Sequence, residues 1–209
     1  MENKKLYAFG RPNAFAHPEG LMGVFAAWIM GRVSVEQNRW AVSHLDVLTA
    51  DHVLEIGFGP GLGIAFLSKL ASKGLVVGVD PSSVVMRQAR KRNASAIDSG
   101  RVELREGAMP SLPFGDGQFD KVLSVNNVML WPSPGASMSE VRRVLKPGGR
   151  LVITLTPMWA KSFEDVEDMS EEIADLVNQA GFINVSVDLR KDMKPAGALS
   201  VTAHNDLLR

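Results

Sequence analysis

The chain has 209 residues, of which 45% are hydrophobic and 22% charged, and its 23 basic and 23 acidic side chains balance to a net charge of zero. This length predicts one domain with a sizeable core, with or without an appendage. The balanced charge shows no general electrostatic footprint for nucleic acid or an anionic membrane. Because the chain has no cysteine, disulfides, thiolate zinc sites and a cysteine nucleophile are excluded.

The first 48 residues read differently from the rest. Prolines and glycines in residues 1–20 predict an irregular arm, and residues 21–48 show a helical pattern that Gly31 interrupts. The start lacks the long apolar core of a signal peptide, and the apolar stretch from Leu21 to Gly31 is too short to span a bilayer. We therefore expect a cytoplasmic protein without stable membrane insertion.

From residue 52 onward, short apolar runs alternate with helical patterns. The expected strands are 52–56, 75–79, 101–105, 119–125, 150–156, 182–189 and 198–204, and the expected helices are 61–73, 83–96, 136–145 and 164–180. This alternation indicates βαβ units and a parallel sheet. The loop at 191–197 is too short for a crossover helix, so the last two strands should pair antiparallel.

A glycine run follows the first of these strands, where residues 53–63 read V-L-E-I-G-F-G-P-G-L-G. Such a turn before a helix lets backbone approach a ligand closely, and the helix N-terminus favours negative charge. Dinucleotide oxidoreductases use G-x-G-x-x-G, but Leu62 stands at the third glycine position here. The run therefore indicates a different ligand, or a different placement of one.

Asp80 ends the next strand, 23 residues after Gly57. A carboxylate at that place can accept hydrogen bonds from both hydroxyls of a ribose. Alternatively, Asp80 only caps the helix that follows its Asp-Pro-Ser turn. Because the strand end, the spacing and the glycine run agree, we favour a ligand with an adenosine-like ribose.

Four stretches carry a resemblance to a known family: V-L-E-I-G-F-G-P-G (53–61), V-V-G-V-D-P-S (76–82), L-P-F-G-D-G-Q-F-D-K-V-L-S-V-N (112–126) and E-V-R-R-V-L-K-P-G-G-R-L-V-I-T (140–154). In this order and spacing they resemble the class I S-adenosylmethionine-dependent methyltransferases of the broad type 11 kind. The resemblance covers about residues 45–205. It implies an α/β fold, namely a Rossmann-like, doubly wound, seven-stranded sheet, mostly parallel with an antiparallel last strand and with helices on both faces. It also implies a methyltransferase domain at 49–209, with residues 1–48 forming a substrate lid.

The same resemblance implies a cofactor site for S-adenosyl-L-methionine, with S-adenosyl-L-homocysteine as the product. The implied cofactor-binding residues are Glu55, Gly57, Gly59, Gly61, Asp80, Pro81, Ser82, Gly107, Ala108, Met109 and Asn126. Glu55 would orient the amino end, Asp80 the ribose, and Gly107–Met109 the adenine edge. Many relatives carry an aspartate where this chain has Ala108, so we expect a weaker adenine contact.

The acceptor pocket is expected between the arm and the loops after the fourth and fifth strands. Its candidate residues are Tyr7, His17, Phe25, Trp28, Asn127, Trp131, Met158 and Trp159. Aromatic and methionine side chains line apolar small-molecule sites, so we expect a small apolar or aromatic methyl acceptor. We name no catalytic base and expect no metal, since methyl transfer needs a base only if the acceptor keeps a proton until attack.

Alternatives remain open at this point. The acceptor could be a lipid or quinone, or a nucleic acid, although the zero net charge argues against the last. Leu62 and the single N-terminal tyrosine disfavour an NAD(P)-dependent oxidoreductase. A non-catalytic cofactor-binding module is a further alternative, which the sequence does not distinguish from an active methyltransferase. We expect a monomer or a homodimer.

Overall fold

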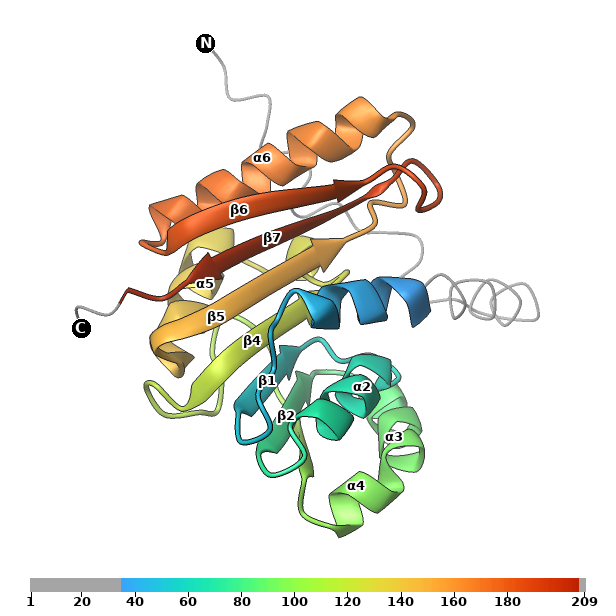
Figure 1. The fold of residues 1–209 in the computed structure, drawn as a ribbon, viewed down its shortest axis with the longest axis vertical. Helices are drawn as coiled ribbons and strands as arrows, with labels where there is room; N and C mark the ends of the chain where they lie inside the picture. The colour runs from blue at the N-terminus through green and yellow to red at the C-terminus, as the bar shows by residue number, and fades with distance from the viewer. Residues whose placement is uncertain (1–34, 207–209) are drawn as a thin grey trace.

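The computed structural model describes residues 35–206, which form one seven-stranded sheet with helices packed against it (Figure 1). The strands are β1 (His52–Ile56), β2 (Leu75–Asp80), β3 (Val102–Glu106), β4 (Phe119–Val125), β5 (Leu145–Leu155), β6 (Ile183–Arg190) and β7 (Ala198–His204). They lie in the order β3-β2-β1-β4-β5-β7-β6, and β7 runs antiparallel to both of its neighbours. The predicted Rossmann-like sheet with an antiparallel last strand is therefore confirmed.

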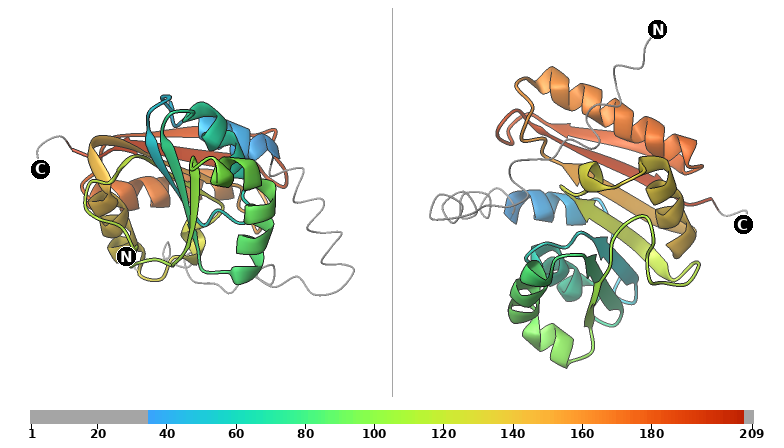
Figure 2. Two further views of the ribbon diagram at one scale, coloured as in Figure 1. Left: turned by 90° about the horizontal axis from the view of Figure 1, so that it is seen from below. Right: turned by 180° about the vertical axis from the view of Figure 1, so that it is seen from behind.

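Helices cover both faces of the sheet (Figure 2). The helical segment 35–43 shares one face with α2 (Leu62–Leu70), α3 (Ser83–Arg92) and α4 (Ala94–Asp98), while α5 (Pro134–Val144) and α6 (Phe163–Gln179) cover the other. Successive strand side chains point to opposite faces, so Val53 belongs to one buried cluster and Leu54 to the other. Ala41, Val42 and Leu45 join the first cluster, which fixes the segment after residue 34 to the sheet.

Two elements differ from the sequence-based expectation. The expected helix 83–96 is divided at Asn93, because the Asn93 amide donates to the carbonyl oxygens of Gly61 and Ala89, both at 3.0 Å. The expected strand 150–156 begins earlier, since α5 ends at Val144 and the Lys-Pro-Gly-Gly segment is already part of β5. Both differences arise from contacts between segments that are distant in sequence.

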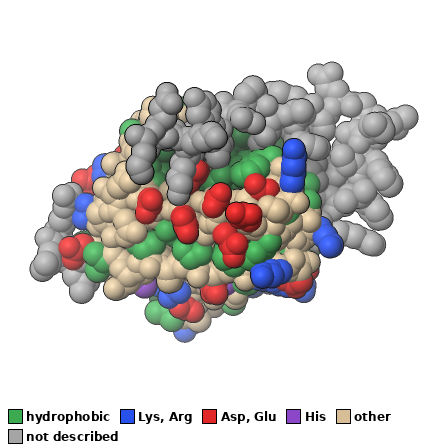
Figure 3. All heavy atoms as spheres, turned by 90° about the horizontal axis from the view of Figure 1, so that it is seen from above, with side chains coloured by type: hydrophobic (Ala, Val, Ile, Leu, Met, Phe, Trp, Pro, Cys, Tyr) green, Lys and Arg blue, Asp and Glu red, His purple; other side chains and the backbone are tan. Residues whose placement is uncertain are grey.

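The outward face of α6 is acidic, as Figure 3 shows. The helix begins at a capping box between Ser162 and Asp165 and packs an apolar stripe on the sheet. Its acidic side chains are Glu164, Asp165, Glu167, Asp168, Glu171, Glu172 and Asp175, with no basic residue among them. Within residues 35–206, no helix is long and apolar enough to cross a membrane.

The parallel pairing of β1 to β5 brings their carboxyl ends to one edge of the sheet. Every predicted site residue in the described part of the chain is one of the last two residues of one of these strands or follows it. We call this edge the carboxyl edge. The opposite edge holds the start of β4, the start of β5 and the end of β7.

Candidate active site

The fourth glycine of the run, Gly63, lies against a buried carboxylate. A Cβ atom at Gly63 would sit 2.2 Å from Oε1 of Glu55, a side chain that is only 2% exposed. Burial raises the pKa of Glu55 to about 8, while a hydrogen bond from the Ile64 N–H lowers it and the nearby Asp80 carboxylate raises it further. Oε2 of Glu55 has no hydrogen-bond partner among the described residues, which leaves one buried polar oxygen for a ligand.

Two of the other glycines are also required by protein packing. A Cβ atom at Gly57 would collide with the Asn127 amide at 2.2 Å, and one at Gly61 would lie 2.7 Å from Ala89 and Asn93. Gly61 also has the left-handed conformation, with φ of +77°, at the start of α2. Only Gly59 differs, since a Cβ atom there would meet nothing within 4 Å. Gly59 is therefore the part of the loop that leaves open space above the backbone.

The Asp80 carboxylate lies directly beside this open point. Its Oδ2 accepts a hydrogen bond from the Gly59 N–H at 3.1 Å, and its Oδ1 accepts one from the Ser82 N–H at 2.9 Å. Asp80 is 8% exposed, and Ser82 caps α3 through its hydroxyl oxygen and the Val85 N–H. The cap of α3 is thus supplied by Ser82, while the lone pairs left on the two Asp80 oxygens can accept from further donors.

A narrow pocket of about 110 Å³ lies next to this carboxylate. It is lined by Ile56, Gly57, Val79, Pro81, Gly107, Ala108, Met109, Asn127, Leu130, Trp131 and Pro132. Whole-ligand pockets measure ~300–1,000 Å³, so this one suits a single flat part of a ligand. The structure thus brings the predicted adenine-edge residues together with Pro81 at the end of β2.

Asn127 and Trp131, which the sequence assigns to the acceptor, line this same pocket. The Trp131 ring nitrogen donates to Oδ1 of Asn127 at 2.6 Å, and Trp131 is buried. The hydrogen bond holds the Asn127 amide over Gly57. In this structure both side chains therefore lie on the predicted adenine side of the site.

Asn126 directly follows β4 and lies in the left-handed region, with φ of +52°. Its amide forms two hydrogen bonds with the amide of Gln37, at 3.0 and 2.7 Å, and its Oδ1 also accepts from the Thr156 N–H at 2.8 Å. Sequence reasoning missed Gln37, because a polar residue 89 positions away in a helical segment carries no local sign of this contact. The pair joins segment 35–43 to the carboxyl edge.

Large apolar side chains remain exposed in the segments that follow β4 and β5. Leu130 is 54% exposed, Met158 50% and Trp159 43%, and they follow β4 and β5. We call these three residues the apolar rim. Exposed apolar groups gathered next to a pocket are typical of a binding surface. Tyr7, His17, Phe25 and Trp28, the other predicted acceptor residues, lie outside the described residues.

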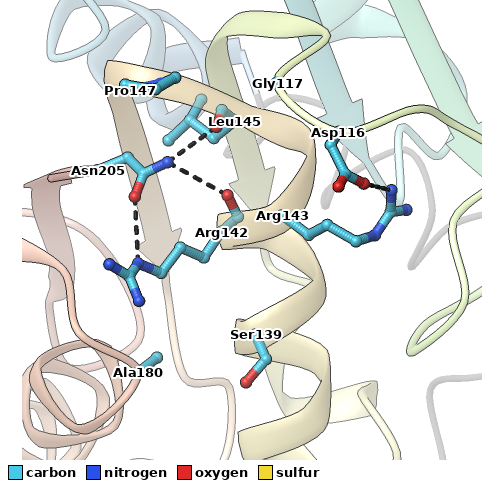
Figure 4. Close-up of a pocket in the computed structure, with 9 residues that line it drawn as sticks. All are labelled: Asp116, Gly117, Ser139, Arg142, Arg143, Leu145, Pro147, Ala180 and Asn205. Atoms are coloured by element: carbon cyan, nitrogen blue, oxygen red, sulfur yellow. Dashed lines mark hydrogen bonds and ion pairs between the residues drawn. The ribbon is translucent and has the colours of Figure 1, made fainter. Parts of the chain in front are cut away.

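A larger pocket, of about 560 Å³, lies at the opposite edge of the sheet (Figure 4). The side chain of Asn205 accepts from Nε of Arg142 and donates to the carbonyl oxygens of Arg142, Leu145 and Lys146. Arg143 is paired with Glu140 and Asp116. These polar groups bond mainly to one another, so the pocket is explained by the way α5 ends and β5 begins.

The described histidines offer no free base at the site. His44 is bonded to Asp188 and to the Trp40 carbonyl, and His52 starts β1. His204 of β7 lies opposite Arg150 of β5 in the strand register, at the opposite edge of the sheet. Burial and the positive charge of that arginine lower the pKa of His204. No group of three or more potential metal ligands occurs among residues 35–206.

Comparison with known proteins decides the family. A family model described as a methyltransferase domain matches residues 54–153, which contain the glycine loop, Asp80, the narrow pocket and Asn126. The chain carries a class I S-adenosylmethionine-dependent methyltransferase domain. S-adenosylmethionine is the cofactor of this class, and the open point at Gly59, the Asp80 carboxylate and the unpartnered Glu55 oxygen fit such a ligand.

The sequence relatives extend over different shares of the chain. The uncharacterized methyltransferase YdaC of Bacillus subtilis is 29% identical over 86% of this chain and 97% of its own length. A fatty-acid O-methyltransferase of Mycolicibacterium smegmatis is 32% identical over 63% of this chain, and a demethylmenaquinone methyltransferase of Lactiplantibacillus plantarum is 30% identical over 62%. The chain covers only 51% and 59% of those two proteins.

A solved structure supports the fold of the methyltransferase domain. The S-adenosylmethionine-dependent methyltransferase from Aquifex aeolicus superposes with a TM-score of 0.67 at 20% identity. The superposition covers 80% of this chain and 89% of that one. At this identity the likeness shows the fold, and the acceptor has to be argued from the site.

Proposed function

We propose that this methyltransferase transfers the methyl group of S-adenosylmethionine to a small apolar or aromatic acceptor. The observation that carries the acceptor class is the apolar rim, where Leu130, Met158 and Trp159 stay about half exposed in the segments that follow β4 and β5. Two relatives named for fatty-acid and quinone substrates support the same class. The acidic face of α6 and the zero net charge argue against a nucleic acid acceptor. A cytoplasmic location and a monomer or homodimer stay predictions.

In this proposal the cofactor lies along the carboxyl edge. Asp80 accepts from the ribose hydroxyls, as its position beside the Gly59 N–H allows. Glu55 and the loop from Gly57 to Gly61 hold the methionyl end. The narrow pocket takes the adenine ring, with contacts from Pro81, Ser82, Gly107, Ala108 and Met109.

When bound, the cofactor supplies an electrophilic methyl group on a positively charged sulfur. The protein's part is to hold the acceptor in line with that methyl group and to exclude water. Of the described histidines, His44 is already bonded to Asp188 and to the Trp40 carbonyl, and His52 and His204 lie at the opposite edge. An apolar molecule that carries an already ionised oxygen needs no base, so we expect carboxylates and acidic phenols to react better than alcohols.

The test measures S-adenosylhomocysteine formation with acceptors of matched chain length. Medium-chain carboxylic acids and acidic phenols should give turnover, while alcohols of the same length should give little. Trp159→Ala should lower kcat/KM for the acceptor about tenfold, since an apolar contact of this size contributes roughly 1–2 kcal/mol. Its affinity for S-adenosylhomocysteine should not change. Equal turnover with RNA or with polar amines would contradict the proposed acceptor class.

A further inference from the structure

The hydrogen bond between Asn126 and Thr156 replaces a bond of the regular sheet. In a parallel ladder, a residue donates to the carbonyl one position before its partner and accepts from the N–H one position after it. Asn126 donates to the Thr154 carbonyl at 2.9 Å, so Thr156 should donate to the Asn126 carbonyl. The Thr156 N–H instead bonds to the Asn126 side chain, at Oδ1. The side chain thus takes the place of its own backbone carbonyl.

The backbone of Asn126 has a positive φ at the place where its side chain replaces its carbonyl as the acceptor. Asparagine adopts the left-handed region more readily than other non-glycine residues, and such a conformation is kept where the surroundings hold it. Here the amide of Asn126 is held on both sides, by Thr156 and by Gln37. The carbonyl oxygen of Asn126 is consequently released from β5 at the carboxyl edge.

Gln37 is held rigidly enough to serve as such a support. It is 1% exposed, and both of its amide groups bond to Asn126. The segment that carries it is fixed at other points, because Glu36 pairs with Arg190 and His44 with Asp188. Arg190 also lies over the Trp40 ring, 5.8 Å from its centre. The Gln37–Asn126 pair therefore links a segment anchored on β6 to the end of β4.

We propose that Gln37 is a positioning residue, which holds Asn126 in the conformation that frees its carbonyl oxygen to accept from the amino group of the cofactor. The proposal rests on the proposed function, because it needs the methionyl end of the cofactor to lie at β4. Losing one hydrogen bond to a charged donor should weaken cofactor binding about tenfold. The affinity for a ligand that contains only the adenosine part should be unaffected.

The experiment compares two ligands by calorimetric titration. S-adenosylhomocysteine has the amino group, whereas 5′-methylthioadenosine keeps the adenosine and thioether parts and lacks the amino acid end. Gln37→Met keeps the length of the side chain and removes both hydrogen bonds. We expect it to weaken S-adenosylhomocysteine binding about tenfold and to leave methylthioadenosine binding unchanged.

Two further variants keep the test sharp if Gln37→Met folds poorly. His44→Ala loosens the same segment without touching Asn126, so it should lower the melting temperature and leave the ratio of the two affinities unchanged. Asn126→Gly tolerates the backbone conformation, and adding Gln37→Met to it should cause no further loss of affinity.

The outcomes separate this proposal from the proposed function. If Gln37→Met weakens both ligands equally, Gln37 has only a structural role and the positioning proposal is wrong. If Gln37→Met changes neither affinity, the proposal is also wrong. If the unaltered protein binds neither ligand, the cofactor site itself has been misassigned, and the proposed function fails with it.

Discussion

The larger pocket and the glycine loop lie at opposite edges of the sheet, and both contain buried polar side chains, yet those side chains differ in how they are satisfied. At the opposite edge, Asn205 bonds to Arg142 and to three carbonyl oxygens. At the carboxyl edge, an oxygen of Glu55 lacks a partner within residues 35–206, and a Cβ atom at Gly59 would meet nothing. The pocket at the opposite edge is about five times larger, so pocket size does not identify the ligand site here.

This difference teaches that open volume alone does not locate a binding site. A buried group without a partner is also insufficient by itself, since Nε of Arg150 and Nδ1 of His204 lack one at the opposite edge within residues 35–206. The carboxyl edge is distinguished by the combination of Glu55, Asp80 and the open point at Gly59. A polar group that is fully bonded within the protein contributes to stability, and removing it costs stability. A buried polar group with spare capacity costs stability until a ligand satisfies it. Substitutions at the two edges should therefore have opposite consequences for binding and for folding.

The largest effect is expected at Asp80. Asp80→Ala removes the acceptor for two ribose hydroxyls, and at ~1.5–3 kcal/mol for each charge-assisted bond the affinity for S-adenosylhomocysteine should fall at least about 100-fold. Asp80→Asn keeps the shape and serves as the matched variant, with a smaller loss. Calorimetric titration measures both. Unchanged affinity in Asp80→Ala would remove the distinction between the two edges.

Asn205→Ala should show the reverse pattern at the opposite edge. It leaves the carbonyl oxygens of Arg142, Leu145 and Lys146 without their side-chain donor, so the free energy of unfolding should fall by about 2–3 kcal/mol. Urea denaturation measures the loss. Ser139→Ala, in the same pocket but exposed, is the control and should change little. A drop in cofactor affinity without a loss of stability would mean that the larger pocket is functional.

Glu55→Gln sharpens the comparison, because two effects are expected of it. It should weaken the binding of S-adenosylhomocysteine, and it should remove the cost of burying an ionisable carboxyl group in the folded protein. The pKa of Glu55 is about 8 in the folded protein against an ordinary value of 4.5. Between these values the folded protein keeps a proton that the unfolded chain has lost, so stability is fully present below pH 4.5 and is lost as the pH rises toward 8.

Glutamine does not titrate, so the melting temperature of Glu55→Gln should rise relative to the unaltered protein from pH 5 to pH 8. At pH 8.5, its affinity for S-adenosylhomocysteine should fall about tenfold, through loss of a charged partner for the amino end. Thermal melts over this pH range and calorimetry at pH 8.5 measure the two effects. A pH-independent difference in melting temperature would show that Glu55 does not titrate in this window.

The smallest effect is expected at Ala108, which lines the narrow pocket and is exposed. Ala108→Asp provides an acceptor for the adenine amino group without burying the new charge. The affinity for S-adenosylhomocysteine should rise up to about fivefold, as one hydrogen bond of ~1 kcal/mol allows. Ala108→Asn is the neutral control. If neither variant tightens binding, the adenine ring does not lie at Ala108.

Local sequence patterns predicted the fold well because the strands and helices depend on local periodicity. The strands around Val53, Val77 and Leu123 and the antiparallel hairpin at the end of the chain follow from apolar runs and loop lengths. The division of the helix at Asn93 did not, because it depends on a hydrogen bond to Gly61, 32 residues away.

The site residues stay predictions, while the packing contacts around them were not foreseen from the sequence. The glycine run was interpreted as facing a ligand, whereas three of its four glycines make room for Asn127, for Ala89 and Asn93, and for Glu55. The contact of Gln37 with Asn126 had no sequence signal for the same reason. Sequence motifs indicate which segments contact a ligand. The packing partners named here come from segments that lie close together only in the folded chain.

The most direct test of the central claim is a calorimetric titration of the unaltered protein with S-adenosylmethionine and, separately, with NADH. A ligand site at the carboxyl edge, built from Asp80, Glu55 and the open point at Gly59, predicts micromolar binding of S-adenosylmethionine and none of NADH. Binding of NADH without S-adenosylmethionine would contradict it.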